Sequence, residues 1–563
     1  MDRNLENIIA KFISISLALI TVLVVAGPVS DPVNVPKFLI LGTVAFALLP
    51  IFGDKNLRIN FVKDKILVFT FSAFLFFSIW STFTSSAPLS QNLYGVFGRN
   101  NGLITIMSFL MIFVAITQFS SISNLDILVK GLIVAGILNI IYGLIENFFG
   151  DPIPWNNNYG ALLGTFGNPD FAGAFYGLLT ALWFSYALYS KTKVILRWSS
   201  LALLIFTLYC VLLTDTTQGL LVSAISISIV GWLYLKLKIK NKIFSNTYLI
   251  LLGIGAVTTL LGILQKGPLS SLLYKRSVSL RGSYWDAAIN TGNQHLWTGV
   301  GLDSFGNWYR RMRSLKAATW MPGPETITNV SHNYYLDIYA SGGLPLLLSY
   351  SAVTCIGIVS CIKIIRKTNE FQPLPVMLVG LFIGFQAQSF ISIPQIGLAV
   401  WGWVVVGALY SYSKIINSEI TVNINSKKQS KKYDNFEKPW GIFIFIGLCI
   451  GFLVAIPPYS ADAKWSDALK SQDLKKLEVA LKPSYFTPQE SNRLANAVIL
   501  LENNKLPDQA YKYALQGVDF NGDNFDAWKM LYYATKSTAV DKSLALSNMK
   551  RLDPLNKNLE KLK

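Results

Sequence analysis

Long apolar stretches, separated by short polar linkers, fill most of this chain of 563 residues. A helix needs about 20 predominantly apolar residues to cross the hydrocarbon core of a bilayer. Backbone polar groups inside lipid must be satisfied within their own segment, so the spans are expected to be α-helices. The pattern predicts thirteen of them, near residues 8–27, 36–53, 66–84, 102–120, 127–148, 171–189, 197–213, 217–235, 247–265, 343–362, 375–390, 396–413 and 439–457. The predicted fold class is therefore all-α, a polytopic membrane helical bundle.

Two long polar segments interrupt the apolar pattern, a loop at 266–342 and a tail at 458–563. The predicted parts, in order, are transmembrane helices 1–265, the loop 266–342, transmembrane helices 343–415, a basic linker 416–438, a last span 439–457 and the helical tail 458–563. The remaining linkers leave no room for an ATPase domain. Energy for any reaction is therefore expected from an ion gradient or from a substrate that arrives already activated.

The composition supports a membrane protein, because 52% of the residues are hydrophobic and only 14% are charged. Soluble domains carry about 25% charged residues. The net charge of +18 would suggest nucleic acid in a soluble protein, but here the basic residues concentrate in alternate linkers. The short linkers between them hold only Lys37 and Arg99. By the positive-inside rule this predicts a cytoplasmic N-terminus and an extracytoplasmic loop and tail. The lipid bilayer is the expected partner, and nucleic acid is not.

The loop carries one histidine that suits acid–base chemistry. His332 is one of only two histidines in the chain and lies directly before an apolar span. An imidazole with a pKa near about 6.5 is largely neutral at pH 7 and can accept a proton from a hydroxyl. The alternative is a histidine that only forms hydrogen bonds at the start of a helix. His295, the other histidine, suits a turn.

The arginines of the loop could bind an anion, and its aromatic residues could bind a sugar. Arg281 opens an apparent helix at 282–291 and precedes Trp285 by four residues. A guanidinium binds two phosphate oxygens in a planar fork, which suits a diphosphate. The cluster at Arg310–Arg313 could do the same, or could contact lipid headgroups. The aromatic residues of the loop either form a belt at the membrane interface or stack on sugar rings.

Several short motifs together resemble the O-antigen ligase and polymerase superfamily. They are "DPVNVPKFLIL" (31–41), "GTFGNPDFAGAFY" (164–176), Arg281 with Trp285, "HLWTGVGLDSF" (295–305) and "SHNYYLDIYASGGLP" (331–345). The resemblance covers about residues 20–415, with the signature domain roughly at 200–405. Members of this superfamily are metal-independent glycosyltransferases embedded in the membrane, with a C-type (GT-C-like) helical fold.

The resemblance implies a reaction on the outer face of the membrane. A glycan moves from a polyprenyl-diphosphate carrier to an acceptor hydroxyl, His332 accepts the proton, and Arg281 stabilises the departing diphosphate. No metal and no cofactor is implied. The acceptor stays open between a glycolipid of the lipid A type, a growing polysaccharide and a serine or threonine of a secreted protein. The implied location is the inner membrane of a bacterium.

The expected substrate-binding residues are Trp285, Asn333, Tyr335, Gln218, Arg99, Arg276 and Asn168. One of them marks a departure from the superfamily. Where the superfamily often has a functional arginine in Ser-Arg-Gly, "TDTTQG" (214–219) places the uncharged Gln218. Either Arg99 or Arg276 replaces that charge, or the anionic group is held in a different way.

The tail has the pattern of amphipathic helices, with apolar residues at three- and four-residue steps. "VDFNGDN" (518–524) and "KRLDPLN" (550–556) close two units about 32 residues apart, which resembles degenerate tetratricopeptide repeats. The residues expected to pack between the helices are Ala510, Ala514, Trp528 and Leu531. Repeat arrays of this type bind peptides or partner domains, so an envelope-assembly protein is the expected partner. The alternative is a small helical cap without a ligand.

Other functions stay open at this point. A protein O-oligosaccharyltransferase is one subtype of the proposed enzyme, and a transporter or flippase for a lipid-linked saccharide is a different class. Carriers place ionisable residues inside their spans, and Glu146 is nearly the only such residue in the predicted spans. A scaffold that only displays the tail would leave Arg281, Trp285 and His332 without a role.

Overall fold

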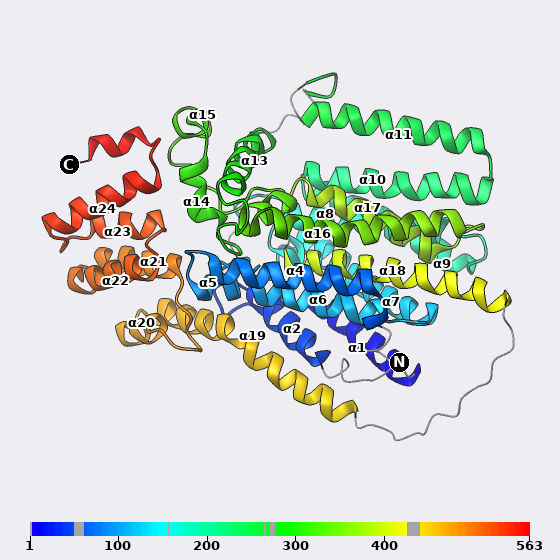
Figure 1. The fold of residues 1–563 in the computed structure, drawn as a ribbon, viewed down its shortest axis with the longest axis horizontal. Helices are drawn as coiled ribbons and strands as arrows, with labels where there is room; N and C mark the ends of the chain where they lie inside the picture. Colours follow the sequence, from blue (N-terminus) through cyan, green and yellow to red (C-terminus); the bar gives the residue numbers. More distant parts are fainter. Residues whose placement is uncertain are drawn as a thin grey trace.

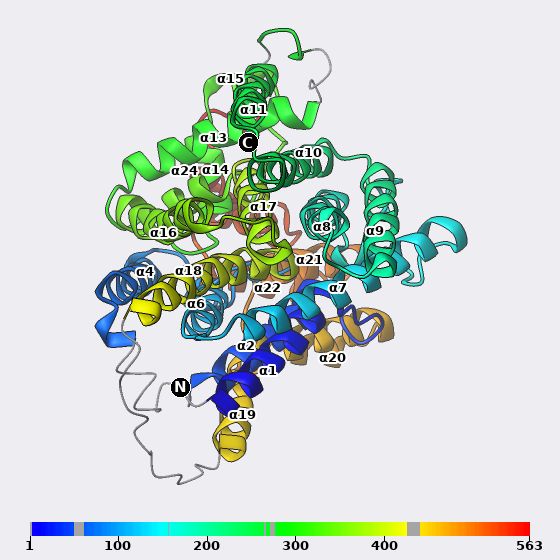
Figure 2. The same ribbon diagram turned by 90° about the vertical axis from the view of Figure 1, so that its right-hand side faces the viewer.

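The apolar stretches form α-helices that run side by side in one bundle (Figure 1). This computed structural model describes residues 3–49, 61–155, 157–263, 266–270, 276–393, 395–424 and 440–562. The helices of the bundle are α1 (Arg3–Val22), α2 (Asn34–Ala47), α4 (Lys65–Thr84), α6 (Leu103–Thr117), α7 (Ile122–Phe149), α8 (Pro169–Leu188), α9 (Val194–Leu213), α10 (Thr217–Tyr234), α11 (Lys242–Ile263), α16 (Tyr334–Lys367), α17 (Pro373–Ser389), α18 (Ile396–Ile424) and α19 (Trp440–Ser471). Helix α18 lies in the centre, and its residues 396–409 are all buried (Figure 2).

Each of the thirteen predicted spans overlaps one of these helices. Among the described residues, nine helices are long and apolar enough to cross a membrane, and α2, α6 and α17 are shorter apolar helices. Large apolar side chains are exposed on the outer faces of α4, α9, α11 and α19, for example Phe69, Leu212, Ile250 and Phe445. Soluble proteins rarely expose apolar surface on this scale. The helices therefore support a polytopic membrane protein, while its orientation across the membrane stays a prediction.

The charge pattern suggested that Lys37 lies in an outer linker, but the structure places it elsewhere. It is a fully buried residue of α2, its Nζ donates a hydrogen bond to the carbonyl oxygen of Thr21, and it lies over the ring of Phe166 at 4.9 Å. Lys37 is therefore an ionisable residue inside a helix of the bundle, in addition to Glu146. The carboxylate of Glu146 accepts the backbone N–H groups of Leu163 and Gly164, so its lone pairs are used within the fold.

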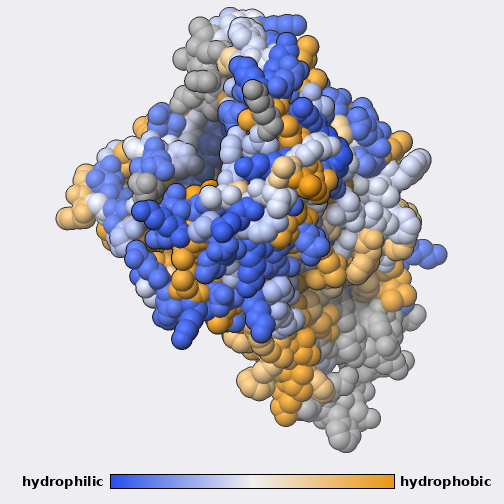
Figure 3. Space-filling view, turned by 90° about the vertical axis from the view of Figure 1, so that its left-hand side faces the viewer, coloured by the Kyte–Doolittle hydropathy of each residue, from blue (hydrophilic) through white to orange (hydrophobic). Residues whose placement is uncertain are grey.

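The loop and the tail lie together at one end of the bundle (Figure 1). The short helices on that side are α5 (Leu89–Tyr94), α13 (Arg276–Gln294), α14 (Phe305–Met312), α15 (Leu315–Thr319), α20 (Leu474–Leu481), α21 (Ser491–Asn503), α22 (Pro507–Phe520), α23 (Phe525–Tyr533) and α24 (Ala539–Leu552). Hydrophilic side chains cover much of this end of the molecule (Figure 3). Helix α13 is longer than the predicted helix at 282–291, because it begins at Arg276.

The tail is built from two helical hairpins, α21 with α22 and α23 with α24. Ala510, Ala514 and Leu531 are each at most 1% exposed, and Trp528 packs partly buried against the same core. These four positions therefore pack as expected. The classification of the hairpins as tetratricopeptide repeats stays a prediction.

Helix α19 connects the bundle to the tail and packs on α2 through small residues. A Cβ atom on Gly451 would lie 2.6 Å from the carbonyl oxygen of Thr43, and one on Gly447 would lie 2.8 Å from the Cα of Ala47. Small residues spaced four apart allow the backbones of two membrane helices to approach closely. This contact fixes the helix from which the tail projects.

We expect Gly451→Val to weaken the packing of α19 on α2, because the added methyl groups meet backbone atoms. Overpacking of this kind costs about 1–3 kcal/mol, so the melting temperature of the full chain in detergent should fall. Gly441→Val makes the same change on the same helix, where a Cβ would meet no atom within 4 Å. Equal melting temperatures for both variants would contradict the close contact.

Candidate active site

Backbone contacts between two sequence motifs fix the end of α16 that carries His332. Gly343 lies inside α16 with φ of 67°, which interrupts the helix, and the N–H of Leu344 donates to the carbonyl oxygen of Leu296 at 2.7 Å. A Cβ on Gly299 would lie 2.1 Å from the backbone of Ser341. The glycines of "HLWTGVG" and "ASGG" are therefore needed for one close backbone contact. The span predicted to begin at 343 is only the part of α16 after this interruption.

A short turn holds His332 at the start of α16. The side-chain oxygen of Asn333 accepts the first backbone N–H groups of the helix, which is an N-cap. On the other side, the N–H of Ser331 donates to the Asp337 carboxylate at 2.8 Å. His332 itself has φ of 55°, a conformation that non-glycine residues seldom adopt. Because both neighbours are anchored, the direction of the imidazole is set by the turn.

Helix α13 presents three predicted or neighbouring residues to this turn. Tyr284 and Trp285 lie three and four residues after Arg281, so each of them neighbours Arg281 on the surface of the helix. The ring of Tyr284 stacks on the imidazole of His332, with centroids 5.7 Å apart and planes at 28°. Tyr284 was not among the predicted site residues. Its spacing from Arg281 was the signal that could have found it.

The surroundings of His332 keep its imidazole neutral. Burial lowers the pKa of His332 to about 4, and the positive charges of Arg281 and Arg99 add to this effect. Besides these two cations, the titratable group packed against the ring is the phenol of Tyr284. At pH 7 the imidazole therefore has a free lone pair and can accept a proton.

Arg281 has an anionic partner at the N-terminus of α8. Its guanidinium lies 3.7 Å from the carboxylate of Asp170, and the two side chains are 12% and 37% exposed. Asp170 is in the first turn of α8, where the helix dipole also stabilises negative charge. A guanidinium and a helix N-terminus together form a site for an anion. Asp170 was not predicted as a site residue, because the sequence does not show which cation it meets.

Two other predicted residues meet at the same end of α8. Asn168 is its N-cap, and its side-chain oxygen accepts the N–H of Asp170 at 2.9 Å. Gln218 donates from Nε2 to the backbone oxygen of Asp170 at 3.3 Å. Gln218 is 2% exposed, and its Oε1 is buried without a hydrogen-bond partner among the described residues. The structure therefore brings Arg281, Asn168 and Gln218 together around Asp170.

Arg99 lies close enough to lower the pKa of His332, but its guanidinium is held by protein groups. It pairs with Asp303 at 2.6 Å and donates to the carbonyl oxygen of Asn329 at 3.0 Å. Burial raises the pKa of Asp303, and the charge of Arg99 opposes that shift. Arg276 begins α13, but its side chain lies outside the described residues. Neither arginine is shown to replace the charge that Gln218 lacks.

The remaining predicted residues differ in their surroundings. The carboxamide oxygen of Asn333 is used by its capping role. Tyr335 faces the bundle, where its hydroxyl bonds to Gln386 and its ring stacks on Phe390. Trp285 has a buried Nε1 without a hydrogen-bond partner among the described residues. Of the three, Trp285 is the one with a buried polar atom that no described residue satisfies.

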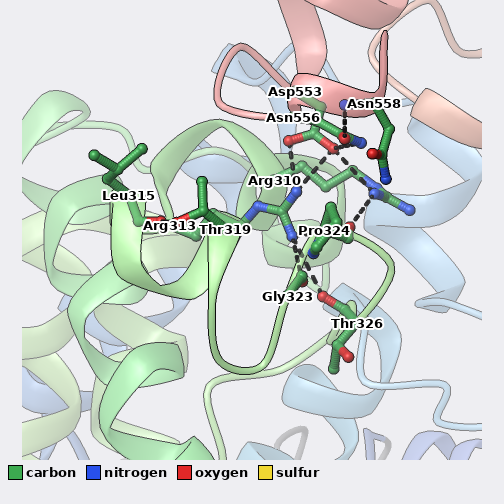
Figure 4. A network of polar contacts seen from close by, with 10 residues as sticks. All are labelled: Arg310, Arg313, Leu315, Thr319, Gly323, Pro324, Thr326, Asp553, Asn556 and Asn558. Carbon is green, nitrogen blue, oxygen red and sulfur yellow. Dashed lines mark hydrogen bonds and ion pairs between the residues drawn. The ribbon is translucent and has the colours of Figure 1, made fainter. Parts of the chain in front are cut away.

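The position of the Arg310–Arg313 cluster in the loop suggested contact with lipid headgroups or with an anion. In the structure these arginines contact the tail instead. Arg310 and Arg313 pair with Asp553 at 3.1 and 2.7 Å (Figure 4). Arg311 pairs with Asp523 of the tail at 2.9 Å. These side chains are at most 11% exposed. The three arginines therefore join the loop to the tail.

A small cavity lies near the candidate site. A cavity of about 60 Å³ lies behind the His332 turn, with Asp303, Asn329, Tyr334 and Asp337 among its lining residues. That space suits water molecules and is too small for a lipid-linked sugar.

In the described part of the chain, no group of three or more His, Cys, Asp or Glu side chains could hold a metal ion. Independence from metal stays a prediction.

Comparison with known families gives one match. Residues 201–351 match the family described as O-antigen ligase. The matched segment contains Gln218, Arg281, Trp285 and His332, and it ends within α16. No curated protein matches the chain. The helices indicate a polytopic membrane protein, and the match of residues 201–351 supports the O-antigen ligase family and a membrane enzyme of glycan transfer.

We expect Arg281→Ala to raise the pKa of His332, because a positive charge beside the imidazole is lost. Diethyl pyrocarbonate acylates only neutral imidazole, so modification of the His332 peptide should be present at neutral pH and be lost as the pH falls through about 4. In the variant this loss should occur at higher pH, as mass spectrometry of the peptide would show. Arg366→Ala, at the exposed far end of α16, should leave the midpoint unchanged. The same midpoint in both variants would exclude a close contact between Arg281 and His332.

Proposed function

We propose that this protein transfers a glycan from a polyprenyl diphosphate to an acceptor hydroxyl at the extracytoplasmic face of a bacterial inner membrane. The observation that carries the proposal is the stacking of the buried, neutral imidazole of His332 on Tyr284, which shares a face of α13 with Arg281. A proton acceptor and a diphosphate-binding cation are the two groups that such a transfer requires. The O-antigen ligase match includes both residues.

The proposed chemistry is a displacement at the anomeric carbon of the donor sugar. The acceptor oxygen attacks that carbon, and the bond between carbon and phosphate oxygen breaks with its electron pair going to the diphosphate. The proton of the hydroxyl passes to a ring nitrogen of His332. The products are the glycosylated acceptor, the polyprenyl diphosphate and an imidazolium, which returns its proton to water or to the diphosphate.

The donor itself would adjust the strength of the base. In the free protein the pKa of His332 is about 4, so the imidazole is a weak base. A diphosphate bound to Arg281 brings negative charge beside the ring and offsets the two guanidinium groups, which raises that pKa. The imidazole would then be the better base only when the donor is present.

Binding of the donor would also change the partner of Arg281. The carboxylate of Asp170 occupies the end of α8 where a phosphate oxygen would bind. Asp170 is 37% exposed, so its carboxylate can return to water when a phosphate oxygen takes its place on Arg281. We propose that the diphosphate replaces Asp170 on Arg281, and that Trp285 Nε1 and Gln218 Oε1 bond to the donor.

The acceptor remains one of three classes, a glycolipid, a polysaccharide or a protein hydroxyl, and a protein acceptor would make the enzyme an O-oligosaccharyltransferase. The tail at the same end of the bundle (Figure 1) favours a large acceptor or an envelope-assembly partner. Comparison of cells with and without the gene would show which surface polymer loses its glycan.

His332→Ala is expected to reduce glycan transfer by about 10²–10⁴, the usual contribution of a positioned base. The assay uses the purified full chain, a polyprenyl-diphosphate glycan and an acceptor extract. His295→Ala changes the only other histidine and should retain most of the activity. Full transfer by His332→Ala would refute the role of this residue as the base.

Arg281→Ala is expected to lower the rate of transfer by about 10²–10³, the usual contribution of a group that stabilises developing charge. Arg281→Lys is expected to be nearly as slow. Lysine keeps the positive charge but cannot form the two-pronged contact with phosphate oxygens. Arg366→Lys is the matched control at an exposed position of α16. Activity of Arg281→Lys close to that of the unaltered protein would show that charge alone is sufficient.

A further inference from the structure

The tail meets the loop at a buried ion pair (Figure 4). Asp553 follows α24, is not exposed, and pairs with Arg313 at 2.7 Å and with Arg310 at 3.1 Å. Arg313 also donates to the carbonyl oxygens of Gly323 and Pro324. Buried charges persist only when they are paired and hydrogen-bonded. Loss of one partner leaves an uncompensated charge, so this contact strongly favours a docked tail.

Helix α14 is held by further tail contacts around this ion pair. Asp523 pairs with Arg311 at 2.9 Å and accepts the hydroxyl of Ser86 at 2.8 Å. The guanidinium of Arg310 lies over the ring of Phe525 at 4.2 Å. The tail therefore fixes α14 by charge and by ring contacts, from the start of α23 and from the end of α24.

A row of contacts leads from α14 to the imidazole. Arg313 lies over the ring of Tyr309, 6.0 Å from its centroid. Tyr309 meets Tyr284 edge to face at 5.6 Å, and Tyr284 stacks on His332 at 5.7 Å. Tyr309 is fully buried and Tyr284 is 8% exposed. Since protein interiors are close-packed, a shift of α14 must move these rings or leave a void beside them.

We propose that the tail is a positioning device for the active site: Asp553 holds α14 in place, and α14 holds the imidazole of His332 in its buried orientation through Tyr309 and Tyr284. The part that concerns catalysis rests on the proposed role of His332 as the base. Asp553 and Tyr309 are positioning residues, because neither touches the imidazole. A merely structural tail would change the amount of folded protein, whereas this device changes the environment of the imidazole.

The test measures the pH at which His332 loses its reactivity with diethyl pyrocarbonate, by peptide mass spectrometry of the full chain in detergent. In Asp553→Asn the midpoint should rise from about 4 toward the ordinary value of about 6.5, because the loosened ring becomes hydrated. The kcat for transfer should fall about tenfold or more, because a displaced base is a less efficient one, with little change in the KM of the donor. Asp508→Asn makes the same change at a tail residue that is 78% exposed and should alter none of these values.

A second pair of variants leaves the ion pairs intact. Tyr309→Leu removes the ring and should also raise the midpoint and lower kcat. Tyr309→Phe keeps the ring, and the hydroxyl that it removes has no hydrogen-bond partner among the described residues, so the midpoint should stay near that of the unaltered chain. If Asp553→Asn does not fold, Tyr309→Leu still tests whether α14 positions the imidazole.

The outcomes separate this proposal from the proposed function. An unchanged midpoint and kcat in Tyr309→Leu, with His332→Ala inactive, overturns the positioning role and leaves the base in place. A raised midpoint in Asp553→Asn and in Tyr309→Leu, with His332→Ala fully active, supports the coupling of tail and imidazole and overturns the assignment of the base.

Discussion

One electrostatic constraint governs the site: burial, together with the positive charges of two guanidinium groups, keeps His332 neutral. Its neighbours come from two segments, Tyr284 and Arg281 from α13 and Arg99 from the loop after α5. A protonated imidazole in this environment would suffer both burial and repulsion. Only an incoming anion relieves that repulsion, which couples the basicity of His332 to the presence of an anionic ligand.

Five arginines of the loop and its neighbours are paired with carboxylates within the protein. Arg281 meets Asp170, Arg99 meets Asp303, and the cluster at Arg310–Arg313 meets the tail. The pairs differ in burial, since Asp170 is 37% exposed while Asp303 is 5% exposed. An exposed pair is weak and exchanges easily, whereas a buried pair is costly to break. This difference in burial favours Arg281 as the cation that exchanges its partner for a ligand, while the other arginines keep the architecture.

The fold could be predicted from the sequence because each span is a local feature, an apolar run of sufficient length. The pairing of charges could not, because it depends on which segments meet. Lys37 was counted with an outer linker, yet α2 begins three residues earlier and buries it. For the same reason the Arg310–Arg313 cluster looked free, although its partners Asp523 and Asp553 lie more than two hundred residues away in the sequence. His332 and Arg281 were predicted from motifs, and the spacing of Tyr284 from Arg281 was readable in the sequence, whereas the pairing of Arg281 with Asp170 became visible only in the fold.

The most direct measurement is an experimental structure of the full chain with a bound polyprenyl diphosphate. The account predicts that phosphate oxygens lie within hydrogen-bond distance of the Arg281 guanidinium at the N-terminus of α8, that Asp170 has left this guanidinium, and that His332 faces the position of the first sugar. A diphosphate bound elsewhere in the bundle, with the pair of Arg281 and Asp170 intact, would contradict it.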